Sequence, residues 1–494
     1  MANKPDVDVV LIKPGSQKQI YGELSDFHLT AVEPPLWACI LAGFLRGKGY
    51  SVELVDAEVD SWSHEETARR VADAKPLLAG VMVSGSNPSA STMNMTGAAE
   101  IIAHLKELAP ETTTMLAGLH PSALPERTMR ETPACDVLCQ GEGFFTLPAL
   151  IDTLKAGSRD FTMHGVWYRD ENGRIAGNQR PPLLEDLDSL PMPAWDMLPM
   201  ERYRAHNWHC FDNIGNRQPY GVLYTSLGCP FRCSFCCINA LFGKNTIRYR
   251  QVDSVMAELD FLVETYGIRN FKIIDEMFAM NEKRVVELCD AIISRKYDLN
   301  FWAYGRVNTV TERMLSKMKE AGVNWIAYGF ESGSKRVIAD VTKGYKMDQV
   351  MGVVEMTRAT GMSICSNFIF GLPEDDYDSM NETLSLMLEI NGEWANIYSA
   401  MAYPGSRLYD MAVEKGWPLP DTWHGYSQYS ADSLPLRTNH LDGGQVLSFR
   451  DYAFNVYYQS PRYLDMIRTR FGEETMGHVM DMSRKQLKRS NAAI

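Results

Sequence analysis

The chain has 494 residues, 45% hydrophobic and 22% charged, which is ordinary for a globular protein and predicts two or three domains at roughly 100–200 residues each. The formal charge of −13 argues against a nucleic-acid-binding surface, because phosphate contacts need a basic face. The charged N-terminus and the absence of a run of roughly 18 apolar residues argue against a secretory signal and a membrane span, and the ten scattered cysteines do not form a disulfide framework, so we expect a cytoplasmic protein.

Short β-branched runs alternate with helix-like segments from residue 7 to about residue 151, a pattern typical of βαβ units in a parallel sheet. We therefore predict a flavodoxin-like (Rossmann-type) domain over residues 1–154, with ligands at the carboxyl ends of its strands. The expected strands are 7–12, 51–56, 77–84, 112–117 and 137–139, and the expected helices are 36–45, 65–74, 93–108 and 145–154.

Residues 155–218 are punctuated by prolines and predict a structured linker. Its aromatic residues Trp195, Tyr203 and Trp208 could line a cleft between domains, and an ordinary surface crossover explains the composition equally well.

A second series of strands and helices predicts a partial (β/α)6 TIM-type barrel over residues 219–405, with its active site at the carboxyl face. A polar, helical C-terminal region over 406–494 follows it. The expected strands begin with 222–226 and continue with 270–275, 300–304, 325–329, 362–370 and 395–402; the expected helices are 254–265, 283–295, 312–321, 335–339, 347–359 and 380–390.

Three cysteines, Cys229, Cys233 and Cys236, lie in one short loop after the first of these strands, with the spacing C-x3-C-x2-C. Thiolates hold iron–sulfur clusters, and three protein ligands on a four-iron cube leave one iron open to another chelator. A zinc site normally needs four nitrogen or sulfur ligands, and a disulfide needs only two cysteines, so neither alternative accounts for the loop as well. Cys237 is interpreted as a small buried residue. The loop predicts a 4Fe–4S cluster that the three cysteines bind.

This loop, with the aromatic Phe235 before its last cysteine, resembles that of the radical SAM superfamily. The resemblance covers about residues 221–405 and implies that S-adenosylmethionine (SAM) binds the open iron and is cleaved by an electron from the cluster. The three cysteines are then both metal ligands and the catalytic residues. A reductant such as flavodoxin or ferredoxin would supply the electron.

Turns at the ends of the barrel strands extend the resemblance. The run Gly329-Phe-Glu-Ser-Gly-Ser334 resembles the segment with which family members contact SAM, which makes Glu331 and Ser332 candidate cofactor contacts. Gly371 resembles the glycine that lies against the adenine. The remaining candidates are Asp275 and Glu276, an inexact match to the motif that binds the methionine amine, and Arg306, which could pair with a carboxylate.

The first 150 residues resemble the cobalamin-binding domain that is often fused ahead of a radical SAM barrel. The stretches that carry the resemblance include Leu11-Ile-Lys-Pro14, Glu33-Pro-Pro-Leu36 and three loops, and the candidate contacts in those loops are Ser84, Gly85, Ser86, Gly118, His120, Gly141 and Glu142. The D-x-H-x-x-G signature, whose histidine binds cobalt in other cobalamin domains, is absent: Asp26 and His28 have the first spacing without the glycine. His120 is a possible residue on the cobalt side or a structural one.

The combination implies a cobalamin-dependent radical SAM methyltransferase that abstracts hydrogen from an unactivated carbon of a small molecule or natural product. An alternative keeps the radical step without cobalamin and leads to dehydration, epimerisation, cyclisation or oxidation, with the first domain as a scaffold. A non-catalytic corrin or cluster carrier is a third alternative, against which the set of SAM-side turns argues. The segment 417–429 is rich in aromatic groups and offers Trp423, His424 and Tyr426 either to a substrate or to ordinary packing.

Overall fold

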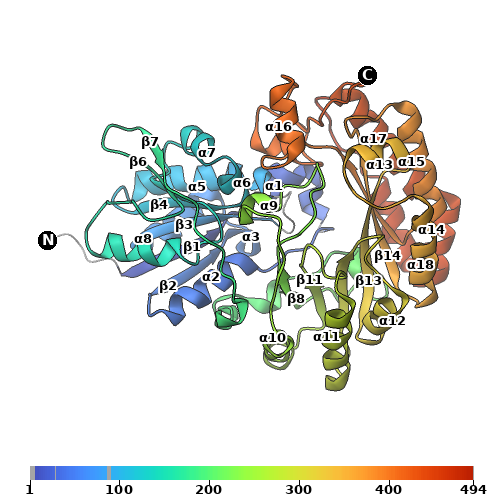
Figure 1. Ribbon diagram of the computed structural model, residues 1–494, viewed down its shortest axis with the longest axis horizontal. Coiled ribbons are helices and arrows are strands. Elements are labelled where there is room, and N and C mark those ends of the chain that lie inside the picture. Colours follow the sequence, from blue (N-terminus) through green and yellow to red (C-terminus); the bar gives the residue numbers. More distant parts are fainter. Residues whose placement is uncertain (1–5, 28, 86–90, 493–494) are drawn as a thin grey trace.

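The computed structural model describes residues 6–27, 29–85 and 91–492. Two sheets of mainly parallel strands lie next to each other, and the C-terminal helices cover the far side of the second sheet (Figure 1). Each sheet corresponds to one of the two predicted domains.

The first sheet has the strand order β2-β1-β3-β4-β5-β6-β7, and its first five strands are parallel. The order 2-1-3-4-5 is that of flavodoxin-like folds, so the predicted fold class is confirmed. The five strands are β1 (Val7–Lys13), β2 (Val52–Asp56), β3 (Pro76–Val83), β4 (Thr113–Gly118) and β5 (Val137–Cys139).

Four helices, α2, α4, α5 and α8, match the predicted ones, and the remaining short helices of this domain lie outside the predicted ranges or, for η3, at the start of one. Helix α4 begins at a capping box. The Ser63 side chain accepts a hydrogen bond from the backbone N–H of Glu66, and the Glu66 side chain accepts one from the backbone N–H of Ser63. The helices are α1 (Gln17–Tyr21), η1 (Gly22–Phe27), α2 (Leu36–Gly47), α3 (Ala57–Asp60), α4 (His64–Asp73), η3 (Thr92–Asn94), α5 (Met95–Leu108), α6 (Leu119–Ala123), α7 (Pro125–Glu131) and α8 (Thr146–Lys155).

Part of the predicted linker belongs to the first sheet. Strands β6 (Val166–Arg169) and β7 (Ile175–Gly177) form an antiparallel hairpin that extends the sheet beyond β5. The side chain of Asp170 closes the turn by accepting hydrogen bonds from the backbone N–H groups of Asn172 and Arg174, at 2.9 and 2.8 Å. The rest of the linker contains only short 3-10 helices: η4 (Leu187–Ser189), η5 (Trp195–Met197), η6 (Met200–Arg202) and η7 (Trp208–Cys210).

The linker aromatics are packing residues. Trp195 and Tyr203 are fully buried, and Trp208 is 4% exposed. Trp208 packs inside the second sheet, with its ring centroid 5.2 Å from that of Trp302 and 5.1 Å from that of Trp325. The hypothesis that these side chains line a cleft between domains is therefore wrong, because the linker fills the amino-terminal end of the half-barrel.

The second sheet is six-stranded and fully parallel, in the order β15-β14-β13-β12-β11-β8. It is the predicted partial barrel, with strands β8 (Tyr220–Leu223), β11 (Asn270–Ile273), β12 (Asn300–Gly305), β13 (Val323–Glu331), β14 (Ser363–Phe370) and β15 (Trp394–Ser399), and a separate pair β9 (Ser226–Leu227) and β10 (Arg248–Tyr249). Its helices are α9 (Asn239–Phe242), α10 (Val252–Tyr266), α11 (Glu282–Arg295), α12 (Glu312–Glu320), α13 (Lys335–Asp340), α14 (Asp348–Ala359) and α15 (Tyr377–Ile390).

Side chains from the C-terminal region cover the open edge of the half-barrel at β15. Tyr458 Oη both accepts from the N–H and donates to the carbonyl of Ala395, at 3.1 and 2.6 Å. Arg450 Nε donates to the carbonyl of Ile397, at 2.7 Å. An edge strand otherwise presents unpaired backbone groups, so this region completes the barrel. Its elements are α16 (Arg407–Glu414), η8 (Trp423–Tyr426), α17 (Gly443–Tyr458) and α18 (Pro461–Ser483).

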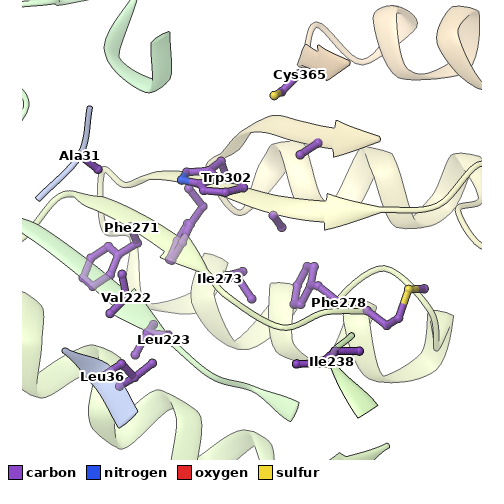
Figure 2. Close-up of a cluster of buried hydrophobic side chains, with 14 of the residues drawn as sticks. Ala31, Leu36, Val222, Leu223, Ile238, Phe271, Ile273, Phe278, Trp302 and Cys365 are labelled. Atoms are coloured by element: carbon purple, nitrogen blue, oxygen red, sulfur yellow. The ribbon is translucent and has the colours of Figure 1, made fainter. Parts of the chain in front are cut away.

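One continuous hydrophobic core joins the two domains. Figure 2 shows Leu36 of α2 close to Val222 and Leu223 of β8. A buried ion pair also connects the domains: Lys272 Nζ of β11 lies 3.2 Å from both carboxylate oxygens of Glu33, and the side chains are 1% and 7% exposed. The carboxyl ends of both sheets are thus held in a fixed relation. Within the described residues, no helix is long and apolar enough to cross a membrane.

Candidate active site

The three cysteines of the predicted cluster loop lie beyond the carboxyl end of β8, in the segment that joins β9 to α9. Cys229 is buried, Cys233 is half-buried and Cys236 is exposed, and all three are free thiols. Gly228 precedes the first of them with a φ of +92°, and a Cβ there would lie 2.4 Å from the carbonyl oxygen of Thr246. The turn into the loop therefore requires glycine.

The thiols are close enough to influence each other's ionisation. The pKa of Cys229 is raised to about 11, first by desolvation and further by the Cys233 thiol. Among the described residues no three side chains converge on a single metal ion. A four-iron cube does not require such convergence, because each thiolate binds a different iron. Three thiolates in one loop match that donor set.

Arg306 lies against this loop. It is 4% exposed, and its Nη1 donates to Cys233 Sγ at 3.5 Å. Its guanidinium also lies over the ring of Phe231, 3.8 Å from the centroid. The sequence suggested that this arginine could pair with a carboxylate; in the structure it places a positive charge beside a predicted cluster ligand.

Asp275 and Glu276 both support the segment that leads to the cysteines. Asp275 is fully buried and accepts three hydrogen bonds of 2.6 Å, from the N–H and hydroxyl of Thr225 and from the hydroxyl of Ser226. Glu276 accepts a hydrogen bond from Gly228 N–H at 3.2 Å, and desolvation raises its pKa to about 8. Asp275 is therefore occupied as an anchor of the loop, whereas Glu276 keeps a partly accessible carboxyl group.

Glu331 forms a buried ion pair with Lys343, a residue that no sequence motif singled out. Glu331 has a φ of +60°, an unusual conformation for a residue with a side chain, and the strand register shifts at this point. A Cβ at Gly329 would lie 2.2 Å from Glu331 Oε1 and 2.7 Å from Lys343 Nζ. The glycine of this motif therefore makes room for the ion pair.

The neighbouring candidates are partly taken up by packing. Ser332 is fully buried, and its hydroxyl is 3.0 Å from that of Thr383. Phe235 is half-buried, with the ammonium of Lys343 5.4 Å from its ring centroid. Gly371 has a φ of +84°, and a Cβ there would lie 2.3 Å from the side chain of Val446. Close packing against α17 is thus one reason for a glycine at this position, and its contact with adenine stays a prediction.

Two candidates of the first domain, Gly118 and His120, lie at the carboxyl end of β4. Gly118 ends β4 with a φ of +122°, and a Cβ there would lie 2.3 Å from the carbonyl oxygen of Val83. His120 is 3% exposed; its Nδ1 is 3.1 Å from the hydroxyl of Thr92, while its Nε2 has no hydrogen-bond partner in the described parts of the chain. Burial lowers the pKa of His120 to about 3, so this imidazole is neutral.

The loop after β3 begins with two half-buried candidates, Ser84 and Gly85. Ser84 N–H donates to the carbonyl of Met82 at 2.9 Å. Ser86 lies outside the described residues. The loop leaves the same edge of the sheet as His120, which is where a flavodoxin-like domain binds its ligand.

Gly141 and Glu142 lie in the loop after β5, and Glu142 connects the two domains. Gly141 N–H donates to the hydroxyl of Ser122 at 2.9 Å. Glu142 and Arg248 form a salt bridge of 2.5 Å, and both side chains are 4% exposed. Glu142 is therefore held in an ion pair with Arg248 of β10, in the half-barrel. The sequence alone does not reveal this role, because the partner lies in the other domain.

Known proteins match both domains. The model of the radical SAM superfamily matches residues 223–387, and that of the B12 binding domain matches residues 27–151. An uncharacterised methyltransferase of Pyrococcus horikoshii is 29% identical over 431 residues, which cover 87% of this chain and 89% of that protein. The anaerobic magnesium-protoporphyrin IX monomethyl ester cyclase of Rubrivivax gelatinosus is 25% identical over 450 residues, which cover 89% of this chain and 77% of that protein.

A solved structure agrees with this architecture. The radical S-adenosylmethionine methyltransferase TsrM of Kitasatospora setae, with cobalamin and a 4Fe–4S cluster bound, is similar with a TM-score of 0.67 at 16% identity, over 97% of this chain and 99% of that chain. Fold and cysteine loop together define an enzyme with a B12-type domain ahead of a cluster-bearing half-barrel. The chain thus carries a radical SAM domain over residues 223–387 and a B12 binding domain over residues 27–151.

Proposed function

We propose that this protein is a cobalamin-dependent radical SAM methyltransferase that acts on a carbon atom of a small molecule. One observation carries the proposal: the same chain contains the three-cysteine loop on the half-barrel and a B12 binding domain beside it. A shared hydrophobic core connects the two domains. The Pyrococcus relative, named a methyltransferase, shares this chain over nearly its whole length.

The residues of the chain have distinct tasks in this proposal. When bound, the cluster supplies an electron for SAM cleavage and the corrin supplies a transferable methyl group. Cys229, Cys233 and Cys236 hold the cluster, and Arg306 donates a hydrogen bond to the sulfur of Cys233. The Glu331–Lys343 pair places a charged group at the carboxyl end of β13, where SAM binds in related enzymes.

A second outcome of the radical step has support of its own. The Rubrivivax relative is named a cyclase and matches the same two domains of this chain, so the architecture alone does not select methyl transfer. Oxidation or cyclisation of the substrate is therefore the competing function.

The test is anaerobic incubation of the reconstituted, cobalamin-loaded enzyme with SAM labelled in its methyl group, a reductant and a metabolite extract. Methyl transfer predicts label in a product, together with release of 5′-deoxyadenosine and a stoichiometric corrin. Release of 5′-deoxyadenosine with no label in any product would favour the competing function. A chain without the predicted cluster would release none, which would overturn both.

A further inference from the structure

Two asparagines lie side by side in the half-barrel, and no step described above uses them. Asn367 belongs to β14 and Asn396 to β15, and the strand register places them directly opposite each other. On its other side, Asn367 lies opposite Gly329 of β13. The three positions form one row across three neighbouring strands.

This row faces the interior of the half-barrel. Tyr328, which precedes Gly329, points outward, because its hydroxyl is 2.9 Å from a threonine hydroxyl on helix α14. Successive positions of a strand face opposite sides of the sheet, so Gly329 and the asparagines level with it face inward. Trp394 lies on the same face of β15 as Asn396, and its ring stacks on Trp208 in the amino-terminal end of the half-barrel, at 6.4 Å between centroids.

The inward face of these two strands is accessible near their carboxyl ends. On β14, Asn367 and Ile369 are half-buried, whereas the outward-facing residues 366, 368 and 370 are buried. On β15, Asn396 and Tyr398 are half-buried, whereas residues 395, 397 and 399 are buried. A small molecule inside the half-barrel can therefore contact both asparagines.

A chain of hydrogen bonds fixes how the two amides are turned. Trp394 Nε1 donates to Asn396 Oδ1 at 3.0 Å, and Asn396 Nδ2 donates to Asn367 Oδ1 at 2.9 Å. Asn367 Nδ2 in turn donates to the carbonyl of Tyr328 at 2.9 Å. An indole N–H can only donate and a carbonyl can only accept, so the two ends of the chain set its direction. The amide of Asn367 has a second N–H, for which the described residues provide no acceptor.

The position of Asn367 brings this second N–H close to the expected SAM site. A Cβ at Gly329 would lie 2.2 Å from Glu331 Oε1 and 2.7 Å from Lys343 Nζ, so the ion pair of these residues lies over Gly329. Neighbouring strands are about 4.8 Å apart, which makes Asn367 the next inward-facing side chain along the row. A substrate that meets the radical formed from SAM has to come close to this side chain.

We propose that Asn367 is a specificity-determining residue that donates a hydrogen bond to a hydroxyl or carbonyl oxygen of the substrate, and that Asn396 is a positioning residue that holds its amide. The inference rests on the radical step of the proposed function and names one feature of the substrate, an oxygen atom close to the carbon that reacts. A molecule without this oxygen would leave the N–H of Asn367 unpaired once water is displaced, and the site would discriminate against it.

The test measures release of 5′-deoxyadenosine by the cluster-reconstituted, cobalamin-loaded enzyme as the concentration of a metabolite extract is raised. Asn367→Leu removes the donor and leaves the substrate oxygen without a partner. It is expected to raise the extract concentration for half-maximal stimulation about 10- to 100-fold. The affinity for SAM, measured from the change that SAM causes in the electron paramagnetic resonance spectrum of the reduced cluster, should not change.

A second variant tests the positioning role of Asn396. Asn396→Ser removes the hydrogen bond to Asn367 Oδ1 and should shift the extract response in the same direction by a smaller factor. Combined with Asn367→Leu it should have no further effect, because the amide that it holds is then absent. Ser366→Ala is the matched control: Ser366 is the preceding residue of β14, is buried and faces outward, and its hydroxyl has no hydrogen-bond partner in the described parts of the chain.

Three results would overturn the inference. One is an equal response to the extract in Asn367→Leu and the parent protein, including no response in either. Another is a loss of SAM affinity as large as the loss of response, because the oxygen would then belong to SAM. The third is an equal shift in Ser366→Ala, which would show a general effect on the strand. A parent protein that releases no 5′-deoxyadenosine would refute the radical step itself, and the inference with it, so the two failures are distinguishable.

Discussion

The guanidinium of Arg306 lies 3.5 Å from the sulfur of Cys233, so a permanent positive charge accompanies one of the three predicted cluster ligands. Because the arginine is 4% exposed, little water screens this interaction. A positive charge at this position favours the more negative, reduced state of a cluster held there.

Arg306→Gln is expected to make the cluster harder to reduce and to slow SAM cleavage about 10- to 100-fold, the range for losing a hydrogen bond to a charged group. Redox titration followed by electron paramagnetic resonance measures the shift. Arg313→Gln, on a side chain that is 69% exposed, is the control. An unchanged reduction potential in the Arg306 variant would contradict this role.

Replacing any one of Cys229, Cys233 and Cys236 by serine should abolish cluster binding, because a cube held by three protein ligands has no spare thiolate. Iron and sulfide content after anaerobic reconstitution measures the loss, and release of 5′-deoxyadenosine should disappear with it. Cys237→Ala is the matched control, since Cys237 is adjacent, buried and has its pKa raised to about 12 by desolvation. Equal loss of iron in that control would show that Cys237 is a ligand.

The Glu142–Arg248 pair predicts a stability effect between the domains. Glu142→Gln leaves a buried arginine without its counter-charge and should cost about 3–5 kcal/mol of unfolding free energy, measured by denaturant titration of the protein. Glu185→Gln is the control, because it breaks an exposed ion pair with Lys244. The side chains of Glu185 and Lys244 are 70% and 54% exposed, so this change should cost at most about 1 kcal/mol of unfolding free energy. Replacing both Glu142 and Arg248 with apolar residues should recover most of the loss, and the idea is wrong if it does not.

Asp375 should make stability fall as the pH rises through weakly acidic values. Desolvation raises its pKa from 3.8 to about 6, so the folded chain holds the proton more tightly than the unfolded chain does. The stabilisation is complete below pH 3.8 and is lost as the pH rises to about 6; it amounts to about 3 kcal/mol at about 1.4 kcal/mol per pKa unit.

Asp375→Asn keeps an acceptor for the N–H groups of Gly371 and Leu372, both 2.9 Å from Oδ2, and removes the titration. Denaturant unfolding at several pH values should therefore show a flatter pH dependence between about 4 and 6 in this variant. Parallel profiles for the variant and the parent protein would refute the assignment.

Much of the fold could be predicted from the sequence because parallel strands are short apolar runs with clear boundaries. Strands β11 and β14 are examples, and the three cysteines could be singled out as predicted cluster ligands because they are close together in the sequence. The hairpin β6–β7 was missed because its strands are short and lie within a proline-rich segment. Its pairing with β5 depends on tertiary structure.

The site could be predicted only where its groups are close in sequence. The sequence does not point to Lys343 or Arg248 as site residues, because their roles depend on distant carboxylate partners. Those partners, Glu331 and Glu142, are 12 and 106 residues away. Asp275 looked like a ligand contact at the end of a strand; its three hydrogen bonds to Thr225 and Ser226 could be known only from the packing of β11 against β8.

The contact between Lys272 and Glu33 has a consequence for how the enzyme is assembled. Swinging the two domains apart would break this ion pair and expose the shared apolar core to water, so the main cost of a hinge-like opening is the lost hydrophobic packing. We therefore expect the two domains to stay together when a cofactor binds.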